Sequence, residues 1–239
     1  MTRPCSVDGL IGMASSLSRA RTIPVGRTRG HNRGMGYYED KILPHVVQFT
    51  CGMPAMRKVR RKATAGLHGD VVEIGFGSGS NVGCYPDEVE SVTAIEPSDT
   101  AWAMAADAVA ASAVPITRGG LDGQRLPFDD DTFDAALSTY TMCTIPDLPA
   151  ALAELRRVVK PGGQLRFLEH GRAPTSVRRW QRRLEPVQIR LGGGCHLTRD
   201  IPALLAAAGW ESVGLDQHYA AKTPKVFGAL SIGTVRALD

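Results

Sequence analysis

A short run of glycines follows an apolar stretch and has the form of a nucleotide-binding loop. The segment 71–74 (Val-Val-Glu-Ile) predicts a buried strand, and residues 75–79 (Gly-Phe-Gly-Ser-Gly) follow it directly. Glycine lacks a Cβ, so the chain can turn tightly here and its backbone can come close to a ligand. The predicted cofactor contacts in this loop are Gly75, Phe76, Gly77 and Gly79.

The spacing of these glycines helps to separate two classes of cofactor. A dinucleotide loop has the pattern G-x-G-x-x-G and seats a pyrophosphate on the next helix. Here the pattern is G-x-G-x-G, Ser80 stands where the last glycine of a dinucleotide loop is expected, and Glu73 precedes the loop. A carboxylate disfavours a pyrophosphate but suits a zwitterionic amino acid and a sulfonium. We therefore add Glu73 to the predicted cofactor site, with a plain strand–helix turn as the alternative.

A second acid stands at the position expected for a ribose contact. Glu96 ends a predicted strand at 91–96 and lies 21 residues after Gly75. An acid there can accept hydrogen bonds from both ribose hydroxyls. NAD and S-adenosylmethionine both carry that diol, so Glu96 indicates a nucleoside without choosing between them. We include its neighbours Pro97 and Ser98, and keep a helix-capping or surface role for Glu96 as the alternative.

A third loop completes the predicted nucleoside site. Asp122 and Gly123 follow a weak predicted strand at 115–119, and Leu-Pro-Phe follows at 126–128. The Asp122 carboxylate can accept a hydrogen bond from the exocyclic amine of adenine. The apolar tripeptide is expected to pack the loop back against the domain.

The elements around these loops alternate between strands and helices. This order predicts an α/β fold, a Rossmann-like, doubly wound, mostly parallel sheet of seven strands, with an N-terminal helical cap from the helical pattern at 38–65. Ligands of such sheets bind outside the carboxyl ends of the strands. The remaining predicted strands are 133–139, 164–169, 210–219 and 225–236, and the predicted helices are 99–113, 147–160, 175–191 and 199–208.

The distribution of charge along the chain limits the other possible functions. Residues 1–35 hold six Arg against one Asp, a net charge of +5, whereas the whole chain has a net charge of +4. We predict a flexible basic arm there, untranslated if synthesis starts at Met35, and one domain at 36–239. The domain itself is near neutral, so we expect no nucleic-acid partner. The basic run at 57–62 is interpreted as a solvated helix face.

The rest of the composition favours a reduced, cytoplasmic protein. Five widely spaced cysteines form neither a disulfide framework nor a zinc motif, so we expect free thiols and no metal. No apolar run reaches the ~20 residues that span a bilayer. Helix 175–191 mixes five Arg with apolar residues, which leaves a weak peripheral membrane contact open beside a plain solvated face.

These motifs together resemble the class I S-adenosylmethionine-dependent methyltransferases of the ubiquinone/menaquinone-biosynthesis type. The resemblance covers residues 71–170, through the glycine loop, Glu96, the Asp122 loop, Phe133-Asp134 and the run 155–163. Segments 141–146, 167–171 and 194–200 are similar to the small methyltransferase-like group that includes animal thiol S-methyltransferases. The membrane helix of those animal proteins has no counterpart in this sequence, which puts anchoring and substrate identity in doubt.

The resemblance implies S-adenosylmethionine as the cofactor and a small molecule as the methyl acceptor. It also implies that residues at the ends of the fourth and fifth strands face the methyl group. Methyl transfer is an in-line displacement in which alignment supplies most of the rate enhancement. We expect an apolar acceptor, a thiol first and then a phenol or quinol. Predicted cofactor contacts at this end are Ser138 and Tyr140, and predicted substrate contacts are Tyr38, Cys143, His170 and His196.

His170 is the candidate catalytic base, because the charge of a histidine can change near neutral pH. A hydrogen-bonded structural role for His170 is an equal alternative. Two other functions remain as rivals: an NAD-linked oxidoreductase, and a non-catalytic protein that uses the fold as a binding scaffold. The acceptor atom, the need for a base and the oligomeric state stay open at this point.

Overall fold

The structure, a computed structural model, describes residues 38–45, 48, 54–221 and 223–238. All of them belong to one compact unit that spans residues 33–239. The predicted basic arm, residues 1–35, lies outside the described residues, as does the choice between Met1 and Met35. The described part contains the whole of the predicted sheet.

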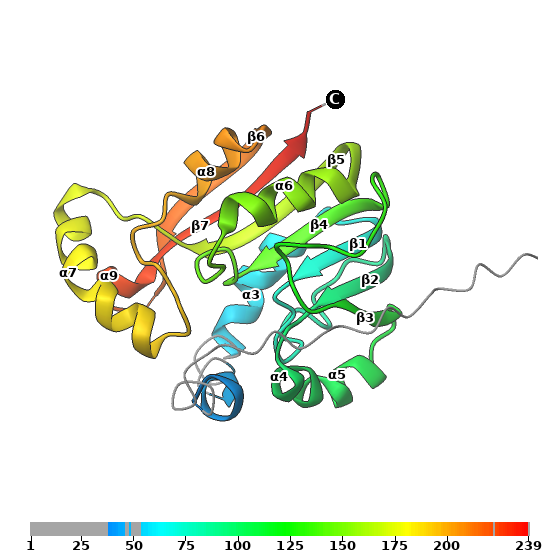
Figure 1. Cartoon of the computed structure of the whole chain (residues 1–239), viewed down its shortest axis with the longest axis horizontal. Helices are drawn as coiled ribbons and strands as arrows, with labels where there is room; N and C mark the ends of the chain where they lie inside the picture. The colour runs from blue at the N-terminus through cyan, green and yellow to red at the C-terminus, as the bar shows by residue number, and fades with distance from the viewer. Residues whose placement is uncertain (1–37, 46–47, 49–53, 222, 239) are drawn as a thin grey trace, which may run out of the picture. The chain divides into compact units, whose positions relative to one another are not determined.

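The centre of the unit is one sheet of seven strands. They are β1 (Gly69–Ile74), β2 (Val89–Ile95), β3 (Ile116–Gly120), β4 (Phe133–Thr139), β5 (Val159–His170), β6 (Trp210–Tyr219) and β7 (Ala229–Ala237). Their order is β3-β2-β1-β4-β5-β7-β6, and β7 runs antiparallel to both of its neighbours (Figure 1). The predicted fold class is confirmed.

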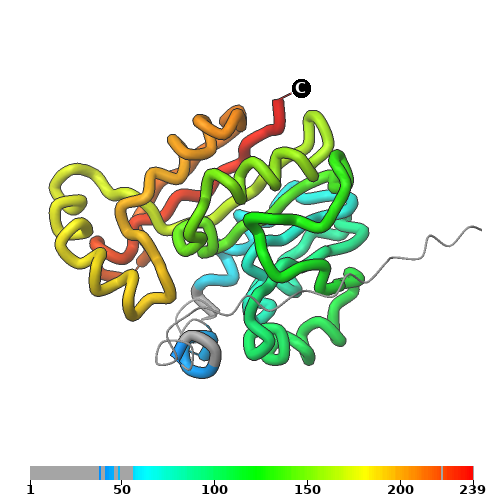
Figure 2. Tube along the Cα trace, in the orientation of Figure 1, coloured from blue at the N-terminus to red at the C-terminus, as the bar shows by residue number. Residues whose placement is uncertain are grey.

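The path of the chain creates a switch point in the middle of the sheet. It moves outward from β1 through β2 to the edge strand β3, and then returns to the centre with β4 (Figure 2). The first and second halves of the sheet therefore diverge between β1 and β4. Open α/β sheets bind their ligands at the carboxyl ends of the strands at such a point.

Helices cover both faces of the sheet. They are η1 (Tyr38–Ile42, a π-helix), α3 (Pro54–Thr64), α4 (Asp99–Met104), α5 (Ala106–Ala110), α6 (Leu148–Val158), α7 (Thr175–Leu191), α8 (Ile201–Ala207) and α9 (Lys225–Gly228). Helices α6 and α8 share one buried core with Phe167, while Ala63 of α3 packs with Leu168 (Figure 1). Successive residues of a strand point to opposite faces, so α3 lies on the other side.

Three predicted elements differ from the structure. The helix predicted at 99–113 is two short helices, because the chain bends at the fully buried Ala105, which packs against Phe76 and Ala94. The strand predicted at 225–236 begins as the helix α9, which follows Pro224. β5 begins at Val159, before the predicted strand at 164, because Val159 already pairs with Phe133 of β4.

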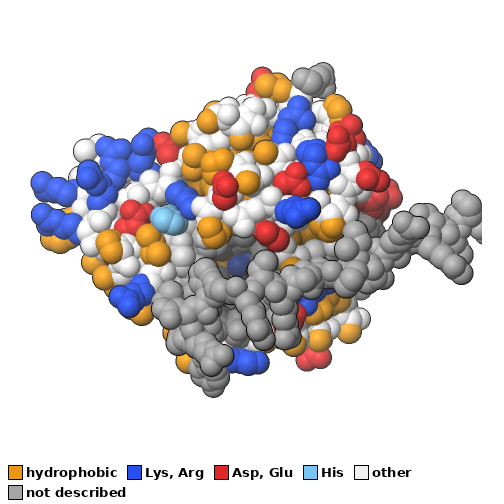
Figure 3. Space-filling view, viewed as in Figure 1, with side chains coloured by type: hydrophobic (Ala, Val, Ile, Leu, Met, Phe, Trp, Pro, Cys, Tyr) orange, Lys and Arg blue, Asp and Glu red, His pale blue; other side chains and the backbone are white. Residues whose placement is uncertain are grey.

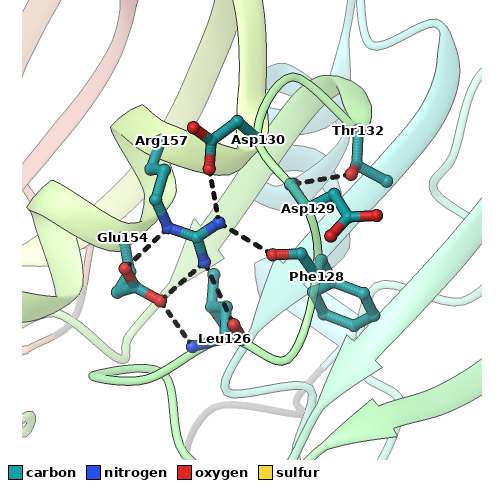
Figure 4. A network of polar contacts seen from close by, with 7 residues as sticks. All are labelled: Leu126, Phe128, Asp129, Asp130, Thr132, Glu154 and Arg157. Carbon is teal, nitrogen blue, oxygen red and sulfur yellow. Dashed lines mark hydrogen bonds and ion pairs between the residues drawn. The ribbon is translucent and has the colours of Figure 1, made fainter. Parts of the chain in front are cut away.

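One arginine fastens the third predicted loop to helix α6. Arg157 donates to the carbonyl oxygens of Leu126 and Phe128 at 3.1 and 2.7 Å, and to the carboxylates of Glu154 and Asp130 at 2.8 to 2.9 Å (Figure 4). Glu154 also accepts from the backbone nitrogen of Leu126. A planar guanidinium serves all of these acceptors at once, which a lysine ammonium cannot do.

We predict that Arg157→Lys lowers the free energy of unfolding by about 1–3 kcal/mol, since hydrogen bonds to a charged group are lost and two carbonyl groups lose their donor. Urea denaturation measures the loss. Arg156→Lys on the same helix is the control, because Arg156 is partly exposed and lies outside this network. Equal stability of the two variants would show that the hydrogen bonds of Arg157 do not stabilise the fold.

Candidate functional site

The parallel register brings the predicted loops to one edge of the sheet. Ile74 at the end of β1 lies beside Ile95 of β2 and Ser138 of β4, and Thr139 lies beside Leu168 of β5. The glycine loop, the Glu96 segment and the ends of β4 and β5 therefore start from neighbouring positions. The sheet itself gathers the groups that the sequence predicts to act together.

Two glycines of the first loop differ in what surrounds the position of their missing Cβ. Gly75 has a φ of +68°, and a Cβ there would collide with the side chain of Thr141 from the loop after β4. Gly77 has a φ of +60°, but the atom nearest to its missing Cβ is the Gly75 oxygen at 4.0 Å. Gly75 is thus required by packing within the protein, whereas Gly77 leaves free space at the surface of the loop.

The carboxylate of Glu96 joins the glycine loop to the start of helix α4. One oxygen accepts from the backbone nitrogen of Gly77 at 2.7 Å, and the other accepts from that of Ser98 at 2.8 Å. Glu96 is 6% exposed, and burial raises its pKa. Ser98 caps α4 by accepting from the nitrogen of Ala101, while Pro97 is exposed beside it. A carboxylate has about four acceptor positions, so Glu96 retains capacity for a diol.

Glu73 lies at the end of β1, below the loop, inside a buried polar network. Its two oxygens accept from Asn81 at 2.8 Å and from the Tyr85 hydroxyl at 2.5 Å, and its side chain is 1% exposed. Burial raises the pKa of Glu73 to about 7, which the hydrogen bonds from Tyr85 and Asn81 only partly offset. Both oxygens face protein groups, so the predicted contact of Glu73 with a cofactor stays a prediction.

Arg60 of α3 completes this network and corrects the interpretation of the basic run 57–62. Its guanidinium donates to Asn81 at 2.8 Å and to the Thr139 hydroxyl at 3.0 Å, and it lies 5.4 Å from the centre of the Tyr140 ring. Arg60 is only 4% exposed, so the prediction of a solvated face is wrong for this residue. Its neighbours in the run do lie at the surface: Arg57, Lys58, Arg61 and Lys62 are exposed.

The Asp122 loop lies against the end of β1. Asp122 is exposed, and one of its oxygens accepts from the backbone and the side-chain nitrogens of Gln124 at 2.9 and 3.0 Å. A Cβ on Gly123 would lie 3.7 Å from the side chain of Ile74. Gln124 in turn accepts from the nitrogen of Asp147, the residue that caps α6. The Asp122 loop is therefore held by hydrogen bonds within itself and to the start of α6, and it lies next to the end of β1.

The loop after β4 is built around the carboxylate of Glu169 at the end of β5. Ser138 donates to it from its hydroxyl at 2.8 Å, and the backbone nitrogens of Thr141, Met142 and Cys143 donate at 3.0 to 3.3 Å. Burial raises the pKa of Glu169, against these four donors. Ser138 is fully buried, so the structure places this predicted cofactor contact inside the protein.

Tyr140 turns the chain into this loop. It has a φ of +56°, which is unusual for a residue with a side chain. Its ring packs against the His170 ring with the centres 4.8 Å apart. Arg199 holds the far side of the loop by donating to the oxygens of Met142 and Ile145, each at 2.7 Å. Sequence reasoning missed Arg199 as a site-forming residue; its only signal was its place in the segment 194–200.

Two of the predicted substrate residues come together with a cysteine that was not predicted. The sulfurs of Cys143 and Cys195 lie 3.6 Å apart, and the ligand atoms of Cys143, Cys195 and His170 all lie within 4.8 Å of one another. Hydrogen bonding with Cys143 lowers the pKa of Cys195 to about 5 and raises that of Cys143. We expected no metal because the cysteines are widely spaced along the chain. Cys143 and His170 are 27 residues apart, and His170 and Cys195 are 25 residues apart.

The other two predicted substrate residues lie on the side of helix α7. The Tyr38 hydroxyl donates to the oxygen of Leu191 at the end of α7 at 2.7 Å. The backbone nitrogen of His196 donates to the oxygen of Cys143, but its ring lies toward Glu185 of α7, 3.8 Å away. Burial lowers the pKa of His196. The structure does not bring the Tyr38 and His196 side chains into the group formed by Cys143 and His170.

A pocket of about 420 Å³ adjoins the Glu96 segment. It is lined by Lys41 of η1 and by four residues of α4, of which Asp99 directly follows Ser98. The other lining residues are Thr100, Ala103 and Met104. This pocket therefore lies between η1 and α4, next in sequence to the segment that holds the predicted ribose contact.

Helix α7 presents the basic surface that the sequence predicts. Lys and Arg side chains gather at the left of the view, over this helix (Figure 3). Arg183 lies over the ring of Trp180, which is 52% exposed. No helix in the described part of the chain is long and apolar enough to cross a membrane. A peripheral membrane contact of α7 stays a prediction.

Comparison with known proteins agrees with this geometry. Residues 72–167 match the family model described as "Methyltransferase domain". The matched segment runs from β1 into β5 and takes in the glycine loop, Glu96 and the Asp122 loop. The solved structure of the N-methyltransferase NodS from Bradyrhizobium japonicum, in complex with S-adenosyl-L-homocysteine, has a TM-score of 0.61 at 15% identity and is similar over 87% of this chain and 98% of its own. That likeness shows that the two chains share a fold.

Curated methyltransferases are similar to parts of this chain in sequence, and two of them represent different acceptor classes. Thiol S-methyltransferase TMT1B of Rattus norvegicus is 31% identical over 54% of this chain and 55% of its own length. Demethylmenaquinone methyltransferase of Mycolicibacterium paratuberculosis is 44% identical over 27% of this chain and 30% of its own length. The chain thus spans about half of the rat relative, and a smaller part of the bacterial one.

The raised pKa of Glu73 predicts a specific dependence of stability on pH. An acid whose pKa is higher in the folded state contributes stability below its unfolded pKa, and this is lost as pH rises through the folded pKa. The change from 4.5 to about 7 corresponds to on the order of 3 kcal/mol. Wild-type protein should lose this contribution between pH 4.5 and 7, whereas Glu73→Gln should not.

Urea denaturation of both proteins at several pH values from 5 to 8 measures the effect. The difference in unfolding free energy between Glu73→Gln and wild type isolates Glu73 from the other titrating groups, and it should shift in favour of the variant as pH rises. Glu90→Gln, at an exposed acid of β2, is the control. A difference that does not vary with pH would show that Glu73 is ionised throughout.

Proposed function

We propose that this chain transfers a methyl group from S-adenosylmethionine to a small apolar acceptor, a thiol first and a phenol or quinol second. The observation that carries the proposal is the Glu96 carboxylate bound to Gly77 and Ser98 at the carboxyl ends of β1 and β2. This arrangement joins a glycine loop to an acid with spare acceptor capacity, which is what a nucleoside with a free ribose diol requires.

The described residues fit the parts of that cofactor. Glu96 would accept from the ribose hydroxyls, and the open side of Gly77 leaves room for the ligand against the backbone. Asp122 would accept from the adenine amine with the oxygen that does not bind Gln124. When bound, the cofactor supplies an electrophilic methyl group on a positively charged sulfur. The NodS structure, solved with S-adenosyl-L-homocysteine, supports this choice of cofactor.

The acceptor side would be the apolar surroundings of Cys143. Cys143 and Leu197 form a buried cluster against which Leu184, Val226 and Phe227 pack. Such a lining excludes water and favours an uncharged, apolar acceptor. His170 at the edge of this cluster lies where a proton can be taken from an acceptor that arrives protonated. The contribution of the chain to rate is then mostly the alignment of acceptor and methyl group.

The choice of a thiol rests on the relative TMT1B, a thiol S-methyltransferase, and the quinol alternative rests on the demethylmenaquinone methyltransferase match. The thiol relative matches 54% of this chain, against 27% for the bacterial one. An NAD-linked oxidoreductase is less well supported, because Ser80 replaces a glycine of the dinucleotide pattern. The scaffold alternative predicts cofactor binding without turnover.

Cofactor binding separates these alternatives. Isothermal titration calorimetry should detect S-adenosylmethionine and not NAD. Gly77→Ala should weaken binding of S-adenosylmethionine by about tenfold or more, because the new methyl group enters the open side of the loop. Gly162→Ala is the matched control: Gly162 also has a positive φ and an unobstructed Cβ position, but it lies near the start of β5. Binding of NAD alone would overturn the proposal.

The acceptor class is tested with a panel of alkyl thiols, phenols, quinols and amines, with formation of S-adenosylhomocysteine as the readout. We expect turnover with the thiols, and faster turnover with those that carry longer apolar groups, since each buried CH₂ contributes about 0.8 kcal/mol. Turnover with quinols but not thiols would move the assignment to the second acceptor. Cofactor binding with no turnover on any acceptor would favour the scaffold.

A further inference from the structure

Two thiols and an imidazole converge where the ends of β4 and β5 meet the chain that follows helix α7. Cys143 lies in the loop after β4, His170 ends β5, and Cys195 follows the glycine tract 192–194. Their ligand atoms lie within 4.8 Å of one another, and the two cysteines are buried. Cysteine sulfur and histidine nitrogen are the donors that Zn²⁺ prefers in proteins.

The distance between the sulfurs matches shared coordination of one ion. The sulfurs of Cys143 and Cys195 are 3.6 Å apart. Two thiolates on one tetrahedral zinc, with Zn–S bonds of about 2.3 Å, stand about 3.8 Å apart. A disulfide would require about 2.05 Å and would leave His170 without a part in the group. Only a small adjustment of the side chains is therefore needed for the three donors to reach a common centre.

The backbone around the three donors is held by hydrogen bonds from several elements. The nitrogen of Cys143 donates to Glu169 at 3.3 Å, and its oxygen accepts from His196 at 2.8 Å, which ties the two cysteine segments together. The buried side chain of Gln181 donates to the oxygen of Gly171, the residue after His170, and to that of Val226. Supports of this kind orient the ligands of metal sites.

We propose that Cys143, His170 and Cys195 bind one Zn²⁺ ion and leave its fourth coordination position to an exogenous ligand. No further Cys, His, Asp or Glu of the described residues belongs to the group. Zinc sites with four protein ligands are structural, whereas sites with three protein ligands and an open position are catalytic. The Cys₂His donor set with one open position belongs to the second kind.

The open position suits a thiol acceptor, a consequence that rests on the proposed function. A thiol that binds zinc loses its proton to solvent and becomes a coordinated thiolate. The thiolate sulfur then forms a bond to the methyl carbon as the carbon–sulfonium bond breaks, and the electron pair of that bond stays on the leaving sulfur. The products are a neutral thioether, which is a weak zinc ligand, and S-adenosylhomocysteine. In this form of the protein His170 is a ligand, and the metal replaces a base.

The test is metal content of the full chain, purified under reducing conditions, loaded with zinc and then dialysed against metal-free buffer. Mass spectrometry of the metals should give one zinc per chain. Replacement by Co²⁺ should give a sulfur-to-cobalt charge-transfer band and the strong visible bands of a tetrahedral site. Cys143→Ser, Cys195→Ser and His170→Ala should each lose at least about tenfold in zinc affinity.

Cys84→Ser is the matched control, because Cys84 is also a buried free thiol but lies outside the group. It should keep both the zinc and the cobalt spectrum. Circular dichroism of every variant shows whether it folds, and the cobalt spectrum of the wild type tests the site without any substitution. A reduced wild-type chain that binds neither ion overturns the proposal, as does a Cys143–Cys195 disulfide in the freshly isolated protein without metal.

The failure of this site and the failure of the proposed function have different signatures. Zinc binding with the cobalt spectrum, but without turnover on thiols, would leave the site standing and refute the thiol assignment. Turnover on thiols that is unchanged in metal-free protein would refute the role of zinc in thiol activation and leave the thiol assignment standing. If both hold, removal of zinc with a chelator should slow turnover on thiols while calorimetric binding of S-adenosylmethionine is unchanged.

Discussion

The acceptor side of the site depends on the buried carboxylate of Glu169. Four donors surround it, and three of them are successive backbone nitrogens, from Thr141 to Cys143. A carboxylate in such a position is costly to bury unless its hydrogen bonds are made, so it strongly favours one conformation of the loop. The positive φ of Tyr140 and the position of Cys143 follow from that conformation. The residue that fixes the loop is thus neither the predicted base nor one of the predicted substrate contacts.

The two halves of the site are constructed on different principles. The nucleoside half uses local segments, in which Glu96, Gly77 and Ser98 lie within a few residues of strand ends and bind one another's backbone. The acceptor half uses long-range contacts, since Cys143, His170 and Cys195 come from three separate segments. Arg60 links the halves, because it lies beside both Asn81 under the glycine loop and Tyr140 at the start of the β4 loop. A change in one half is therefore expected to be felt in the other.

This division explains which features the sequence could predict. The strands, helix α7 and the nucleoside loops were predicted because apolar periodicity, caps and glycine spacing are local signals. The break at Ala105 could not be predicted, because it arises from packing against Phe76 and Ala94. Arg60 was misjudged for a related reason: its neighbours in the run are solvated, and only the contact with Asn81 and Thr139 buries it. Cys195 carried no signal by itself, since its partners lie 25 and 52 residues away.

The fold alone leaves the chemistry of the acceptor open, because the same sheet supports many reactions. What distinguishes this chain is the kind of group at the end of β4 and β5. The described acidic side chain there, Glu169, is already used to hold the loop, so it is not available to accept a proton from a substrate. The groups that remain beside the proposed acceptor position are two sulfurs and one imidazole, set in apolar surroundings. Apolar surroundings favour an uncharged acceptor such as a thiol over a charged one, and this links the proposed thiol acceptor to residues of this chain as well as to its relatives.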